Sequence, residues 1–170
     1  MGLFSFIKNA GAKVFGIGKS TEKEKAEAKA TANAKVAAEE TASEEKAARK
    51  LEQTIVDLRL EVENLKITID DDQATVEGKA YDQSTKEKVV LVVGNTHGIA
   101  TVDDLMTVEH VEPEAKFYTV VKGDTLSKIA KEYYGNANKY PQIFEANKPM
   151  LKDANLIYPG QVLRIPAIDK

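Results

Sequence analysis

Hydrophobic residues recur at two different periods in the middle of the chain, and the change of period marks a helix followed by strands. Positions 48, 51, 55, 58, 62 and 65 are hydrophobic and spaced by three or four, which predicts a helix that ends near Glu61. Hydrophobic and polar residues then alternate over 65–70 and 74–79, with the polar run Asp70-Asp71-Asp72-Gln73 between them. This alternation predicts a β-hairpin with one buried face.

A second helix and a further strand are predicted after the hairpin. Ser84 and Glu87 have the spacing of a capping box, the run KVVLVV follows, and Gly94 is placed to end the helix. A strand from Ile99 to about Val111 completes an α-β-β-α-β unit in which two helices cover one sheet face.

The C-terminal third predicts a second small unit, of order β-α-α-β. Residues 117–121 form a β-rich run, and residues 126–133 have helical spacing as far as Gly135. A short helix around 143–146 and a strand over 162–165 follow. The fold class is therefore α+β, with two small domains.

The N-terminal quarter has few large hydrophobic residues that could form a core. Leu3, Ile7 and Val14 have helical spacing, which predicts a short amphipathic helix that docks on its own protein or lies on a membrane surface. Alanine, lysine and glutamate dominate residues 19–50 and predict a solvated helix. We expect an N-terminal segment over 1–18, a linker over 19–43, and domains over 44–112 and 113–170.

Composition narrows the function. The 170 residues carry 24 Lys and Arg against 27 Asp and Glu, a formal charge of −3, with no Cys and two His. No basic field for nucleic acid, disulfide or thiolate site is expected. No G-x-S-x-G elbow, phosphate loop or H-E-x-x-H pair occurs, and no apolar run reaches the ~20 residues of a transmembrane span. We expect a cytoplasmic, monomeric binding protein without enzymatic activity.

A divalent metal site is the first alternative to consider, because Asp70–Asp72 and Asp103–Asp104 are acidic clusters. Neither has the ligand spacing of an EF-hand loop, so we predict a turn and a solvated strand edge instead. His97 has no second ligand at short spacing, and we predict that it is a surface side chain.

Both domains resemble known families. The segment ITIDDDQATVEGKAYDQSTKEKVVLVVGNTHGIATVDDLM resembles the bacterial BON domain, a binding module associated with phospholipids or other ligands. The segments YTVVKGDTLSKIAKEYYG, IFEANKPML and LIYPGQVLRIP resemble a LysM domain, which implies binding of glycans such as a peptidoglycan fragment.

The LysM resemblance places a glycan groove between two loops. The residues it implies are Gly123, Asp124, Thr125 and Leu126 on one side and Asn155, Leu156, Ile157 and Tyr158 on the other. The same residues have a structural reading, since Asp124 and Thr125 suit a helix N-terminus and Leu126, Ile157 and Tyr158 suit a core.

Together with the N-terminal MGLFSFIKNAG, this order of domains resembles the cytoplasmic bacterial potassium-binding protein (Kbp) family, from which the Ala-rich 19–50 stretch departs. The resemblance implies that K⁺, with Rb⁺ or Cs⁺ able to take its place, is held by main-chain carbonyls. The residues it nominates are Ile7, Ala10, Ala12, Gly94, Thr96 and Ile99.

Physical reasoning favours the same loop. K⁺ is large and weakly hydrated, so a cage of neutral carbonyls suits it better than carboxylates. Residues 94–99 follow a helix C-terminus, where carbonyls lack helical partners and the dipole is negative. The alternative is that Gly94 and Gly98 only end the helix and make the turn.

Two functions remain open at this point. In the first, the cation ties the N-terminal helix to the BON loop, orders the protein and fixes how the LysM domain docks on the BON domain. In the second, the protein is an envelope module that binds peptidoglycan through LysM and phospholipid through BON.

Overall fold

The predicted helix of the first domain is longer than its hydrophobic face. The structure is a computed structural model that describes residues 2–6 and 30–168. Helix α1 (Ala30–Asp57) begins inside the Ala-rich stretch and continues without a break into the domain. Over residues 39–57, where the burial of its side chains is described, the buried residues are Ala48, Leu51 and Ile55. The helix ends four residues before Glu61, because Arg59 adopts a left-handed conformation with φ 56°.

The sheet of the first domain has five strands. The predicted hairpin is strands β2 (Val62–Asp70) and β3 (Gln73–Asp82), which pair antiparallel. The single strand predicted from Ile99 to Val111 is instead two strands, β4 (Thr101–Asp104) and β5 (Thr107–His110), both parallel to β3. The break between them is held by Leu105, whose N–H donates to the Val76 carbonyl at 2.9 Å.

The first described residues form a strand, which corrects the predicted helix there. Strand β1 (Gly2–Ser5) pairs antiparallel with β4 and forms one edge of the sheet order β1-β4-β3-β2. Phe4 and Phe6 pack on the core while Leu3 is 66% exposed, so this segment has the period of a strand. The remainder of the predicted helix, over 7–18, lies outside the described residues.

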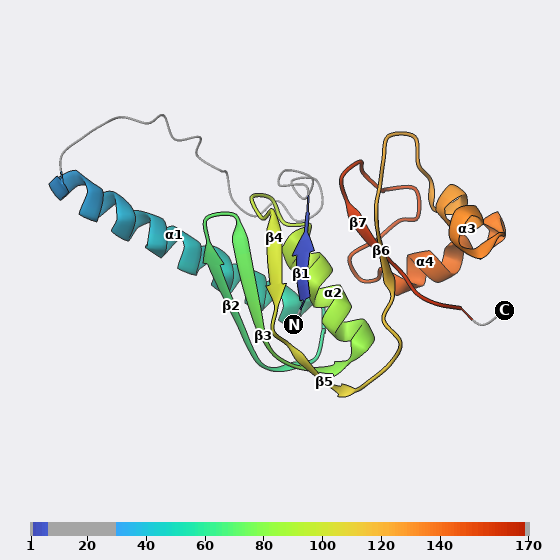
Figure 1. The fold of residues 1–170 in the computed structure, drawn as a ribbon, viewed down its shortest axis with the longest axis horizontal. Coiled ribbons are helices and arrows are strands. Elements are labelled where there is room, and N and C mark those ends of the chain that lie inside the picture. The colour runs from blue at the N-terminus through green and yellow to red at the C-terminus, as the bar shows by residue number, and fades with distance from the viewer. Residues whose placement is uncertain (1, 7–29, 169–170) are drawn as a thin grey trace.

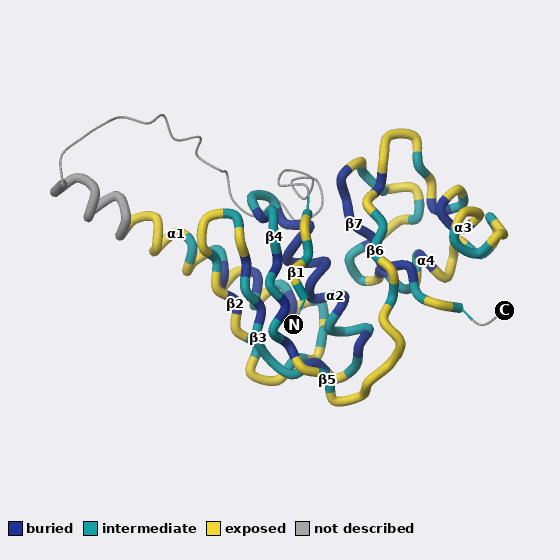
Figure 2. Tube along the Cα trace, viewed as in Figure 1, coloured by how far each residue is buried: buried dark blue, intermediate teal, exposed yellow. Residues whose placement is uncertain are grey.

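Helix α2 (Gln83–Gly94) packs beside α1 on the sheet (Figure 1). Its N-terminal cap differs from the predicted capping box: the Asp82 carboxylate accepts from the Thr85 N–H at 2.6 Å. Residues 89–96 are all buried, and Figure 2 shows this buried segment lying between the sheet and the second domain. A helix that is buried on every side has a partner on every side.

The second domain has the predicted β-α-α-β order. Its elements are β6 (Lys116–Thr119), α3 (Leu126–Tyr134), the 3₁₀ turn η2 (Ala137–Lys139), α4 (Tyr140–Ala146) and β7 (Val162–Ile165). Strands β6 and β7 pair antiparallel. A separate core, including Leu126, Ile129, Ile143 and Leu163, lies between this ribbon and the helices. The α+β fold class with two small domains is confirmed.

Candidate functional site

The 94–99 loop lies at the C-terminal end of α2 and is held tightly there. The Asn95 N–H donates to the Leu91 carbonyl at 2.9 Å, and the Thr96 N–H donates to the Val93 carbonyl at 3.1 Å. The Thr96 hydroxyl donates to the Val92 carbonyl at 2.8 Å. The loop therefore continues the helix end as a hydrogen-bonded turn, with the negative end of the helix dipole directed at it.

The N-terminal segment reaches this loop. The Phe6 N–H donates to the Ala100 carbonyl at 2.7 Å. The Phe6 ring lies on Gly94, where a Cβ would come within 2.1 Å of the ring. Gly94 is therefore required for close approach of the two segments. Of the predicted cation ligands, Gly94, Thr96 and Ile99 lie in this one loop, whereas Ile7, Ala10 and Ala12 lie outside the described residues.

The carbonyls of the loop differ in how they are used. Thr96 O accepts a long hydrogen bond, 3.3 Å, from the Ile99 N–H, and a carbonyl oxygen has a second lone pair. Among residues 2–6 and 30–168, the turn and loop hydrogen bonds involve neither Gly94 O nor Ile99 O. Neutral carbonyl oxygens at a helix C-terminus form a donor set that fits a monovalent cation.

His97 in this loop and Asp104 on β4 correct two predictions. His97 is partly buried, and its Nδ1 atom is enclosed without a hydrogen-bond partner among the described residues. Asp104 is 2% exposed rather than on a solvated edge, and it forms an ion pair with Lys86 at 3.1 Å. Burial raises the pKa of Asp104. The Asp71-Asp72 turn between β2 and β3 is present as predicted.

The two loops of the predicted glycan groove contain residues with evident structural roles. The Asp124 carboxylate accepts from the Tyr118 hydroxyl at 2.8 Å and from the Val121 N–H at 2.9 Å. The first of these bonds raises the pKa of Tyr118 to about 12. Thr125 caps α3, and Leu126 is buried in the core. Gly123 has φ +92° and makes the preceding turn.

On the opposite loop the side chains divide by exposure. Leu156 is 54% exposed and Asn155 is exposed, hydrogen-bonded to Asp153 at 3.2 Å. Ile157 packs against the core, and Tyr158 is partly buried. The exposed groups available to a ligand in this region are thus fewer than the eight residues nominated.

The two domains contact each other along α2, and the sequence did not predict which residues make these contacts. Glu87 and Arg164 form a buried ion pair with Oε2 to Nε 2.5 Å, their side chains 4% and 9% exposed. The Asn95 side chain hydrogen-bonds the Val162 backbone. Continuous hydrophobicity over 89–93, more than one helix face needs, is the sequence signal for a second partner.

The N-terminal strand also contacts the second domain. The rings of Phe4 and Phe117 meet edge to face, with centroids 5.2 Å apart. Strand β1, helix α2 and the LysM ribbon therefore meet at one junction, which reaches the 94–99 loop at Asn95.

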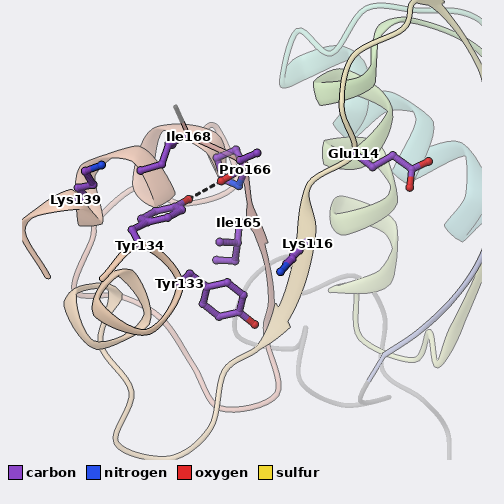
Figure 3. Close-up of a pocket in the computed structure, with 9 residues that line it drawn as sticks. Glu114, Lys116, Tyr133, Tyr134, Lys139, Ile165, Pro166 and Ile168 are labelled. Carbon is purple, nitrogen blue, oxygen red and sulfur yellow. Dashed lines mark hydrogen bonds between the residues drawn. The ribbon is translucent and has the colours of Figure 1, made fainter. Parts of the chain in front are cut away.

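A separate pocket of about 340 Å³ lies on the second domain (Figure 3). Tyr133 and Tyr134 line it over Ile165, and the Tyr134 hydroxyl donates to the Pro166 carbonyl at 2.9 Å. Lys116 and Lys139 lie at its rim, while Glu114 points away from the others in Figure 3. Its lining includes none of the residues predicted for cation or glycan binding.

Comparisons with known proteins agree with both domain resemblances. The family model of the BON domain matches residues 43–110, and that of the LysM domain matches residues 118–166. The chain is 43% identical over 166 residues to a protein of Escherichia coli O6:H1 named potassium binding protein Kbp. That alignment covers 98% of this chain and 99% of the relative.

Other similarities are confined to short segments. An uncharacterized protein of Deinococcus radiodurans is 51% identical over 49 residues, 29% of this chain and 19% of its own length. An esterase of Mycobacterium tuberculosis is 46% identical over 55 residues, 32% of this chain but 12% of the esterase. Within the described residues, no helix combines the length and hydropathy needed to cross a membrane.

Proposed function

Because the chain belongs to the family of the potassium binding protein Kbp, with which it aligns over 98% of its length, we propose that it binds a potassium ion at the 94–99 loop. The ligands are main-chain carbonyls of the loop and of the N-terminal segment. They are Gly94, Thr96 and Ile99 together with Ile7, Ala10 and Ala12. The protein acts as a cytoplasmic sensor or buffer of K⁺.

One observation carries the proposal: the Phe6 ring lies on Gly94. Phe6 immediately precedes Ile7 in the sequence, and its ring contacts the loop. This supports the proposal, because the two groups of nominated carbonyls are about ninety positions apart in the sequence and the described residue that precedes Ile7 contacts the loop. A donor set of neutral carbonyls suits K⁺, with Rb⁺ and Cs⁺ as larger substitutes, better than a divalent cation.

The bound ion would order the protein. Carbonyls from the N-terminal segment and from the loop converge on one cation only when the two segments are held together. A ligand at one hundred times its dissociation constant adds about 2.7 kcal/mol to the free energy of unfolding. The junction with the LysM domain lies beside the same loop, so ordering of the loop favours docking of that domain.

Titration with KCl and NaCl at equal ionic strength tests this function. We expect amide shifts at residues 94–99 and a raised melting temperature in KCl alone, with RbCl and CsCl acting as partial substitutes. Identical melts in both salts, together with unchanged loop amides, would refute potassium binding at this site.

The envelope function is the second candidate, and the exposure of Leu156 in the predicted glycan groove favours it. An apolar side chain that is 54% exposed on one of the two nominated loops is available to pack against a sugar ring. Sedimentation with purified peptidoglycan, lost in Leu156→Ala, together with indifference to potassium, would favour this function over the first.

A further inference from the structure

Asn95 makes the closest polar contact between the 94–99 loop and the LysM domain. Its side-chain Nδ2 donates to the Val162 carbonyl at 2.9 Å, and the Val162 N–H donates to Oδ1 at 2.8 Å. Asn95 is 1% exposed. The side chain therefore pairs with the edge of β7 as a neighbouring strand would, satisfying one donor and one acceptor that are both buried.

A second asparagine shows what this arrangement does within a domain. Asn147, at the end of α4, pairs in the same manner with Arg164: Nδ2 donates to the carbonyl at 2.7 Å and Oδ1 accepts from the N–H at 2.8 Å. The free edge of β7 is thus completed at Arg164 by its own domain and at Val162 by the BON domain. Without Asn95, that backbone donor and acceptor lose their partners.

The position of Asn95 in the chain links this pairing to the proposed cation ligands. The Gly94 carbonyl and the Asn95 N–H belong to one planar peptide unit. The N–H of this unit already donates to the Leu91 carbonyl at 2.9 Å. An ion bound to the Gly94 carbonyl acts on the same peptide plane from its other side and thereby sets the orientation from which the Asn95 side chain extends. That side chain has two rotatable bonds, so a modest rotation of the plane misaligns both of its hydrogen bonds to Val162.

We infer that Asn95 is the positioning residue that couples occupancy of the cation loop to docking of the LysM domain through Val162. The inference rests on the proposed function. Asn95 then acts by positioning the LysM domain and does not bind the ion through its side chain, which faces the LysM domain. Coupling of this kind is reciprocal, so the docked LysM domain raises the affinity of the loop for K⁺ by the same factor by which K⁺ favours docking.

The first test measures the response to K⁺ separately at the 94–99 loop and at Val162. Asn95→Ala is compared with Asn138→Ala, an exposed asparagine of the same domain as Val162. In the parent chain and the control, KCl but not NaCl should shift the amides of Gly98, Ile99 and Val162. In Asn95→Ala the loop amides should still shift, the Val162 response should be lost, and K⁺ affinity should fall about fivefold or more. A Val162 response equal to that of the parent chain would overturn the inference.

The second test works from the LysM side and leaves the loop sequence unchanged. Arg164→Gln removes the ion pair with Glu87 and loosens docking, which X-ray scattering measures as a larger radius of gyration. We expect K⁺ affinity to fall by a factor similar to that in Asn95→Ala, with no further loss in the double variant. Undocking without any change in affinity would overturn the coupling, even if Asn95→Ala distorted the loop.

The outcomes separate this inference from the function on which it rests. Suppose that the loop amides respond to K⁺ in every variant, whereas replacement of Asn95 changes neither the response of the Val162 amide nor the radius of gyration. The coupling is then wrong and the binding function stands. If the loop of the parent chain does not respond to K⁺, both are overturned.

Discussion

The buried ion pair between Glu87 and Arg164 offers a measurable perturbation of the domain contact. The Glu87 carboxylate has three donors: Arg164 Nε at 2.5 Å, Gln83 Nε2 at 2.9 Å and the Ala115 N–H at 2.9 Å. These come from the LysM strand, from α2 itself and from the connection between the domains. A single carboxylate therefore fixes three parts of the chain.

The expected cost follows from burial. Both side chains are less than a tenth exposed, and removing one partner of such a pair strands the other charge at a cost of about 3–5 kcal/mol. We expect Arg164→Gln to lower the free energy of unfolding by about 3 kcal/mol. Urea unfolding should then resolve into two transitions, since the domains lose their main polar tether.

A matched surface pair provides the control. Lys66 and Glu77 form a cross-strand ion pair at 3.5 Å with side chains 69% and 47% exposed, so Lys66→Gln should cost less than about 1 kcal/mol. The double variant Glu87→Gln with Arg164→Gln should lose less than the sum of its two single variants. A loss in Arg164→Gln no larger than in Lys66→Gln, with one unfolding transition, would refute the reasoning.

Three further outcomes are expected. Gly94→Ala places a Cβ 2.1 Å from the Phe6 ring and should weaken K⁺ binding about tenfold in calorimetric titration, unless Phe6→Ala restores the space. Burial raises the pKa of Asp104 above its ordinary 3.8, so the folded protein holds this proton more tightly than the unfolded chain. The free energy of unfolding should therefore fall as the pH rises from 3.8 through the raised pKa of the folded protein. Urea unfolding of Asp104→Asn at a series of pH values should lack this part of the pH dependence. Asp124→Asn should move the Tyr118 ionisation from about 12 toward 10.0, as followed by ultraviolet titration, and an unchanged value would contradict the assigned hydrogen bond.

The elements with long regular patterns were predictable from the sequence. The three-and-four spacing through Leu51 and Ile55 and the alternation on either side of the Asp71 turn each extend over enough residues to fix a period. Both domains followed from such patterns and from their resemblances. The N-terminal strand did not, because Leu3 also fits a helical period and only the free edge of β4 supplies the hydrogen bonds that favour a strand.

The site was predictable only where it is local. The glycines and the helix end at Gly94 mark a loop from the sequence, but the contact of Phe6 with Gly94 joins distant segments. Glu87 illustrates the same limit, since its spacing from Ser84 fits a capping box, whereas its ion-pair partner, Arg164, is 77 residues away. Asn95 gave no signal either, because one polar residue after an apolar run is typical of any helix end.

Strand β7 also bears on how the protein avoids self-association. Its sheet has only two strands, and an uncovered edge of an apolar strand readily pairs with another chain. The amides of Asn95 and Asn147 occupy that edge and leave no stretch of free backbone for a second molecule to extend. A protein whose domains separate would expose the Val162 part of this edge, so conditions that undock the LysM domain are also those under which aggregation should begin.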